Sequence, residues 1–177
     1  KEAIQTFEDY VQLCGWDDMR YFALNLMADL HRDLGEHERS KHCNHVATIM
    51  RPRWPEAYVG MMKTAFQEHQ WDDVIFWGQV VSKCESPNGI IPYNPTMSNI
   101  YPLKLLHFAY ANNGDFPKAA YIAQEAIKAY PSDKAIAICL KNYQKAIRHL
   151  TIQESLLDVK KWLEEHFDHK LLVAADD

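Results

Sequence analysis

The chain has 177 residues, with 19 lysines and arginines against 24 aspartates and glutamates and a formal net charge of -5. Hydrophobic residues make up 47% of it, a globular composition that excludes a disordered tail or a low-complexity linker. No apolar run approaches the ~18 residues that a membrane span needs. The mild acidity argues against a dedicated binder of nucleic acid or of an anionic membrane. The length fits one domain with a sizeable core.

Helix-forming residues are abundant, whereas glycine (6) and proline (8) are few. The spacing of apolar residues predicts helices, in chain order, near 1–13, 19–34, 38–50, 55–68, 71–84, 102–113, 116–129, 133–148 and 152–167. The last of these is amphipathic, and we expect it to cover the final apolar face as an end cap. Because the sequence starts at Lys1 inside a helical pattern, we interpret it as a piece of a longer polypeptide.

An internal repeat organises these helices. Gly35 and Gly114 each separate two amphipathic stretches, and the second stretch ends at Pro52 or Pro131, 17 residues further on in both cases. A helix, a tight turn, a second helix and a proline stop form one helical hairpin. A period of about 34 residues places repeats at 21–54, 55–88 and 100–133. Small residues recur where paired helices would cross, although the middle repeat has larger ones at Met62, His69, Val74 and Val81.

This pattern resembles the tetratricopeptide repeat. The resemblance implies an all-α fold, a right-handed solenoid of helical hairpins with a C-terminal capping helix. In this scheme residues 1–20 contain the second helix of a truncated repeat, 89–99 form an inserted loop and 134–177 form the capping helices. The insertion carries turn-forming residues together with large apolar ones. It therefore either packs back on the solenoid or forms a partner contact, for which the candidates are Ile91, Tyr93 and Tyr101.

No motif in the sequence predicts an active site, a cofactor site or a metal site. His42 and His45 are one helical turn apart in the densest group of histidines, but no HExxH or CxxC pattern accompanies them, and we expect them at the rim of a helix pair. The acidic pairs after Trp16 and Trp71 are expected at helix N-termini, where an aromatic residue packs the turn. The scattered cysteines favour free thiols in a reducing compartment, which predicts a cytoplasmic protein.

The concave face of the solenoid is the candidate binding surface. On the resemblance, it is lined by the first helices of successive repeats and suits a peptide or protein segment. Its exposed inner positions are Asn25, Asp29, Arg32, Lys63, Gln67, Lys104, Phe108 and Asn112. Some co-chaperone repeat domains hold a C-terminal carboxylate with a clamp of Lys and Asn residues. The matching offsets here depart from that clamp, and they include Asp29, Gly60, Tyr101 and Leu105.

A second resemblance concerns the parent protein. Residues 3–21, which include the run Cys14-Gly15-Trp16-Asp17-Asp18, and the junction 52–58 resemble the repeat region that follows a family 2 glycosyltransferase domain in bacterial and phage proteins. The catalytic Asp-x-Asp of that family matches nothing in this chain. The resemblance implies a non-catalytic accessory region that positions an acceptor or mediates assembly. The alternative is a freestanding adaptor that binds a peptide in its groove. Self-association is a further expectation, with Trp162 and the region of Tyr93 as candidate contacts.

Overall fold

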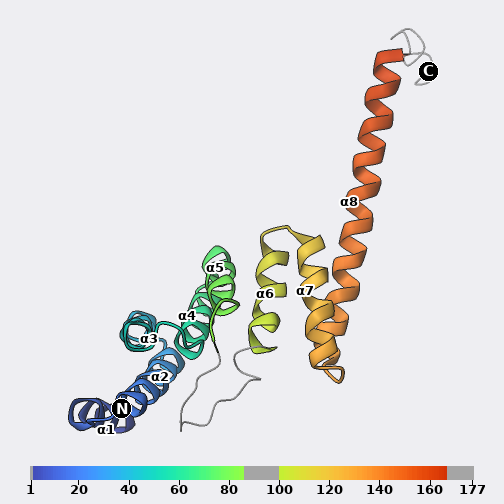
Figure 1. The fold of residues 1–177 in the computed structure, drawn as a ribbon. Coiled ribbons are helices and arrows are strands. Elements are labelled where there is room, and N and C mark those ends of the chain that lie inside the picture. The colour runs from blue at the N-terminus through green and yellow to red at the C-terminus, as the bar shows by residue number, and fades with distance from the viewer. Residues whose placement is uncertain (1, 86–99, 167–177) are drawn as a thin grey trace.

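The computed structural model describes residues 2–85 and 100–166, and these residues form helices, with no strand among them (Figure 1). The helices are α1 (Glu2–Leu13), α2 (Asp17–Asp33), α3 (His37–Met50), α4 (Glu56–Gln67), α5 (Trp71–Val81), α6 (Tyr101–Asn112), α7 (Phe116–Ala129) and α8 (Lys134–His166). The first seven agree with the predicted ranges to within a few residues. The candidate loop contacts Ile91 and Tyr93, and the expected loop 89–99, lie outside the described residues.

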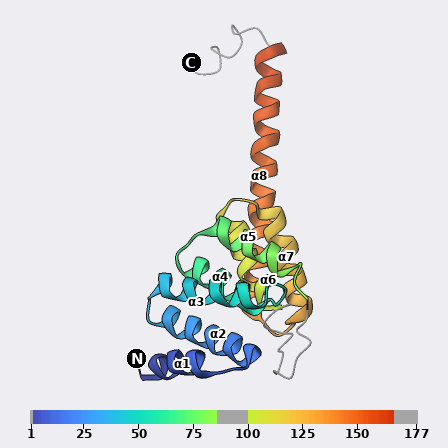
Figure 2. The same ribbon diagram turned by 60° about the vertical axis from the view of Figure 1, so that its left-hand side comes forward.

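The helices stack in chain order, as the two ribbon views show (Figures 1 and 2). The hairpins α2–α3, α4–α5 and α6–α7 fall largely in the ranges 21–54, 55–88 and 100–133, and the first two each contact the next hairpin in the chain. Among their first helices, α4 contacts both α2 and α6. The fold therefore brings residues from three repeats onto one face.

The turn inside each hairpin has the same backbone conformation. Gly35, His69 and Gly114 have φ angles of 75°, 57° and 79°. In each turn the next residue donates its N–H to a carbonyl five residues earlier, at 2.9 Å, in the pairs Glu36–His31, Gln70–Ala65 and Asp115–Tyr110. This is the left-handed helix end that glycine favours. The predicted helices 55–68 and 71–84 already left a turn at residues 69–70, and a histidine adopts the glycine conformation there.

Small residues allow the helices to approach closely, as the repeat pattern predicts. Ala28, Ala47, Ala119 and Ala126 are fully buried. In the middle repeat Met62 and Val74 are also fully buried, together with Ala109 of the following hairpin. The helices α3 and α7 end just before Pro52 and Pro131, as expected of residues that cannot continue a helix.

The C-terminal region differs from the prediction of two helices. Residues 134–166 form one continuous helix, whose first half packs on α7 through Ile136 and Tyr143. The second half projects beyond the stack in both views (Figures 1 and 2). Its apolar residues from Leu150 to Trp162 are exposed. The first half of α8 therefore caps the solenoid. The prediction that the segment from residue 152 covers the final apolar face is wrong, because its described apolar side chains are exposed.

Candidate functional site

A pocket of about 470 Å³ lies where α2, α4 and α6 meet. Its lining comes from all three helices and comprises Arg32, Asp33, Lys63, Phe66, Gln67, Tyr101 and Leu105. Four of these residues, Arg32, Lys63, Gln67 and Tyr101, were predicted from the sequence as groove or loop contacts. The structure brings these four side chains together at one pocket.

Charged residues form a network on one side of the pocket. Arg32, only 9% exposed, contacts Asp29 at 2.5 Å between Nη1 and Oδ1. The ammonium of Lys63 lies 3.7 Å from the same carboxylate oxygen. A second carboxylate, that of Asp33, lies 3.8 Å from Nη2 of Arg32. The two cations and the two anions balance, so the pocket has little net charge.

Lys63 is the polar group best placed to meet a ligand. Its side chain is 15% exposed and lines the pocket, and its ammonium lies 5.4 Å from the centre of the Tyr101 ring. Burial lowers the pKa of Lys63, while Asp29 opposes that shift. An ammonium has three hydrogen-bond donors, and the described side chains offer it only the long contact to Asp29 and the ring. It can therefore donate to a group that enters the pocket.

The apolar wall of the pocket was missed by the sequence analysis. Phe66 and Leu105 lie three and four residues after Lys63 and Tyr101, which places each pair on one helix face. That spacing was available in the sequence, but large apolar residues at such positions are far more often core than site. Asp33, an exposed residue at the end of α2, also lines the pocket and was not among the predicted groove residues.

The other predicted groove residues have local structural partners. Lys104 contacts Asp133 at 2.6 Å and lies over the ring of Tyr130, so it joins α6 to the turn before α8. Asn25 and Asn112 each donate to the carbonyl four residues earlier in their own helix. Phe108, 43% exposed, packs edge-to-face on Phe66 beside the pocket.

The histidines that the structure describes are not grouped into a metal site. His42 and His45 are exposed, which confirms their expected place at the rim. His31 is buried and contacts Glu36 at 2.6 Å, whereas His37 contacts Glu68 at 3.5 Å. In the part of the chain that the structure describes, no three His, Cys, Asp or Glu side chains are grouped to hold a metal ion.

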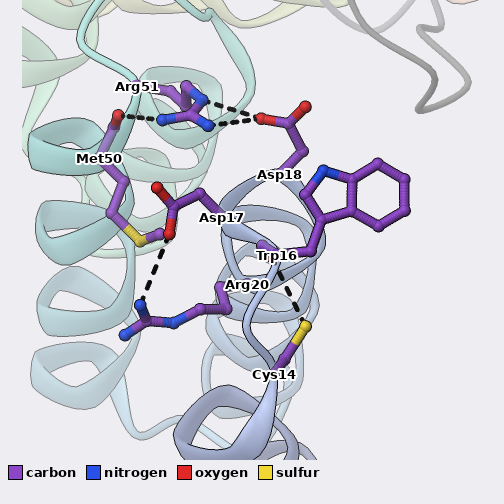
Figure 3. Close-up of polar contacts among 7 residues, drawn as sticks. All are labelled: Cys14, Trp16, Asp17, Asp18, Arg20, Met50 and Arg51. Carbon is purple, nitrogen blue, oxygen red and sulfur yellow. Dashed lines mark hydrogen bonds and ion pairs between the residues drawn. The ribbon is translucent and has the colours of Figure 1, made fainter.

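The motif after α1 forms a structural joint (Figure 3). Asp18, in the first turn of α2, accepts from Arg51 Nε at 2.9 Å and Nη2 at 2.6 Å, and Arg51 Nη1 donates to the Met50 carbonyl. The joint thus ties the start of α2 to the end of α3. The acidic residues lie at a helix N-terminus as predicted. Trp16, however, is 46% exposed, and its indole points away from Met50 rather than packing the turn.

Tyr21, at the end of the same run of residues, packs against the junction before α4 and against the start of that helix. Tyr21 lies edge-to-face on Trp54 with 5.1 Å between ring centres, and its hydroxyl donates to Glu56 at 3.0 Å. The Tyr21 hydroxyl also accepts from the backbone N–H of Ala57 at 3.2 Å. Residues that carry the resemblance therefore hold neighbouring repeats together.

Comparisons with known proteins address the fold. No protein-family model matches the chain, and no curated protein sequence matches it significantly. A solved structure described as the MamA RS-1 ArsTM double mutant matches with a TM-score of 0.55 and 14% identity, over 95% of this chain and 99% of that one. MamA is a tetratricopeptide-like helical-repeat protein. The match and the helical hairpins confirm the predicted all-α, tetratricopeptide-like solenoid. Because the identity is only 14%, the match is evidence for the fold alone. No helix within residues 2–85 and 100–166 has the length and apolar character to cross a membrane.

Proposed function

We propose that this chain is a non-catalytic interaction domain that binds a peptide or protein segment in the pocket between α2, α4 and α6. The observation that carries the proposal is the convergence of three successive repeats on one cavity. Its lining offers apolar surface from Phe66, Tyr101 and Leu105 beside the ammonium of Lys63. An extended segment can place an apolar side chain on the former and a backbone carbonyl or polar side chain on the latter.

The proposal is tested by selecting binders from a random peptide library displayed on phage against the folded 177-residue chain. We expect selected peptides to bind Lys63→Glu at least about tenfold more weakly, a loss of about 1.4 kcal/mol. Gln67→Ala, which changes an exposed pocket residue without adding charge, should also weaken binding. Lys83→Glu is the matched control, because Lys83 is exposed and lies outside the pocket. Failure to select any peptide, or equal binding to the three variants and wild type, would contradict the proposal.

For the parent protein, we propose the accessory region of a glycosyltransferase, in which the groove positions an acceptor or the domain mediates assembly. Support comes from the sequence resemblance. The contacts of Asp18 with Arg51 and of Tyr21 with Trp54 give a structural reason why the residues that carry the resemblance would be kept in related repeat regions. The repeat scheme adds that α1 takes the place of the second helix of a preceding hairpin. It packs on α2 as α3 packs on α4 and α5 on α6.

The intact mass and N-terminal sequence of the native polypeptide test this second proposal. A larger product with an Asp-x-Asp domain ahead of Lys1 is the expected result, and nucleotide-sugar turnover would then be compared with and without the repeats. A native product of about this chain's size would contradict it. That result would favour a freestanding adaptor.

A further inference from the structure

The distal half of α8 carries an exposed apolar stripe. Ile152, Leu156, Val159 and Trp162 are between 53% and 63% exposed. They follow one another at intervals of four, three and three residues, so at about 100° of rotation per residue they lie within about 120° of the helix circumference. This is the spacing of residues that pack between two paired helices.

The stripe lies on a part of α8 that buries none of its described side chains. Every side chain from His149 to Trp162 is exposed, and the ribbon projects away from the solenoid in both views (Figures 1 and 2). Most of the stability of a helix in a protein comes from packing of its apolar face. Burial of the stripe against another helix would supply that packing.

The charges beside the stripe distinguish between possible partners. Residues 150–162 contain Glu154, Asp158, Lys160 and Lys161, so this segment has no net charge. Helices that lie on anionic membranes have a polar face rich in lysine and arginine, and the acidic residues here make that partner unfavourable. A second copy of the same neutral segment meets no net repulsion.

The same charges indicate how two copies are oriented. Asp158 and Lys160 are about 200° apart around the helix and therefore flank the stripe on opposite sides. In a parallel pair, the Asp158 side of each helix adjoins the Lys160 side of the other, so opposite charges meet twice. An antiparallel pair would place each side against the same side of its partner, so that like charges meet.

We infer that two copies of this chain associate through the Ile152–Leu156–Val159–Trp162 stripe, with their α8 helices paired in parallel. The association is independent of the pocket between α2, α4 and α6. Variants of the pocket and of the stripe therefore test the two proposals separately.

Sedimentation velocity of the full 177-residue chain, from low-micromolar to submillimolar concentration, tests the inference. The expected result is a dimer whose fraction rises with concentration. Leu156→Glu should weaken dimerisation by at least about tenfold, whereas Leu157→Glu should leave it unchanged. Leu157 is a matched control, because it is 67% exposed and lies well away from the stripe around the helix. Asp158→Lys should also weaken the dimer, and adding Lys160→Asp should restore it.

Several results would overturn the inference. A chain that stays monomeric at every concentration excludes the second copy as the partner. Equal effects of Leu156→Glu and Leu157→Glu exclude the stripe as the contact. If Asp158→Lys has no effect on a Leu156-dependent dimer, the parallel orientation is wrong. If the monomer floats with phosphatidylserine-containing vesicles and Leu156→Glu abolishes this flotation, the stripe contacts a membrane.

Discussion

His69 shows how a single residue can depart from the repeat while the backbone preserves it. Its φ of 57° lies in the left-handed region, at the place that glycine takes in the two other hairpins. Non-glycine residues are strained there by roughly 1–2 kcal/mol. The side chain is exposed, and its ring lies 5.3 Å from that of Trp71.

We predict that His69→Gly is more stable than His69→Ala by about 1 kcal/mol, because only the alanine variant keeps the strained conformation with a Cβ atom. Both variants lose the ring contact with Trp71, so their difference isolates the backbone effect. Urea unfolding followed by circular dichroism measures it. Equal stability of the two variants would show that the turn relaxes out of the left-handed region.

His107 is a second residue with a measurable consequence, because it is buried and uncharged. It is 2% exposed, and its Nδ1 lies within hydrogen-bond distance of the Tyr143 hydroxyl oxygen, at 3.0 Å. Burial lowers the pKa of His107 from 6.5 to about 4, and Lys104 adds to the shift while Asp133 opposes it. Between these values the unfolded chain binds a proton that the folded chain does not. The free energy of unfolding therefore falls as the pH drops below 6.5 towards 4, by up to about 3 kcal/mol.

The pH dependence is checked by urea unfolding at pH 7 and pH 4.5 in wild type and in His107→Gln. Glutamine can still form a hydrogen bond with Tyr143 but does not titrate. We expect wild type to lose more stability than the variant between the two pH values. An unchanged loss in His107→Gln would assign the effect to other groups.

At the scale of the elements, the contact between α3 and α4 depends on a glycine opposite a buried amide. A Cβ atom on Gly60 would lie 2.3 Å from Asn44 Oδ1. Asn44 is fully buried, and neither polar atom of its amide has a hydrogen-bond partner among the described residues. The close approach of Gly60 to Asn44 and the unsatisfied amide of Asn44 therefore occur at the same point of the interface between α3 and α4.

We predict that Gly60→Ala destabilises the chain by about 1–3 kcal/mol through overpacking. Asn44→Ala should be neutral or stabilising, because it removes a buried amide without a partner. The double variant should then be more stable than the sum of the single changes, since the alanine at 44 makes room for the alanine at 60. A thermodynamic cycle from urea unfolding measures this coupling, and additive effects would contradict the packing geometry.

The hairpins could be predicted from the sequence because glycine turns, proline stops and helical spacing are local signals. The pocket could be predicted only in part. Helical register placed Lys63 and Gln67 on the correct face, but it could not show that Lys104 is paired with Asp133 or that Phe66 forms part of the wall. The pairing of Lys104 and the place of Phe66 depend on contacts between different helices, and the spacing of residues along one helix does not reveal those contacts. Similarly, an amphipathic pattern after residue 150 indicates a helix with an apolar side but does not say what that side contacts.

At the scale of the whole molecule, α8 combines two roles that a truncation series separates. Its proximal half contributes Ile136 and Tyr143 to the cluster around Ala119 and Ala123. Each such burial is worth about 1.5–3 kcal/mol, and a solenoid needs its terminal apolar face covered. The distal half adds no buried side chain within its described residues.

We therefore predict that a chain ending at residue 149 keeps the stability of the solenoid to within about 0.5 kcal/mol. A chain ending at residue 133 should lose more than about 3 kcal/mol, because it exposes α7 and removes the Tyr143 partner of His107. Both are compared with the full chain by urea unfolding at a concentration where all are monomeric, so that any dimer does not contribute. A large loss on removing only residues 150–177 would mean that the distal half of α8 stabilises the monomer itself. Its exposed stripe would then have a partner within the chain rather than on a second copy.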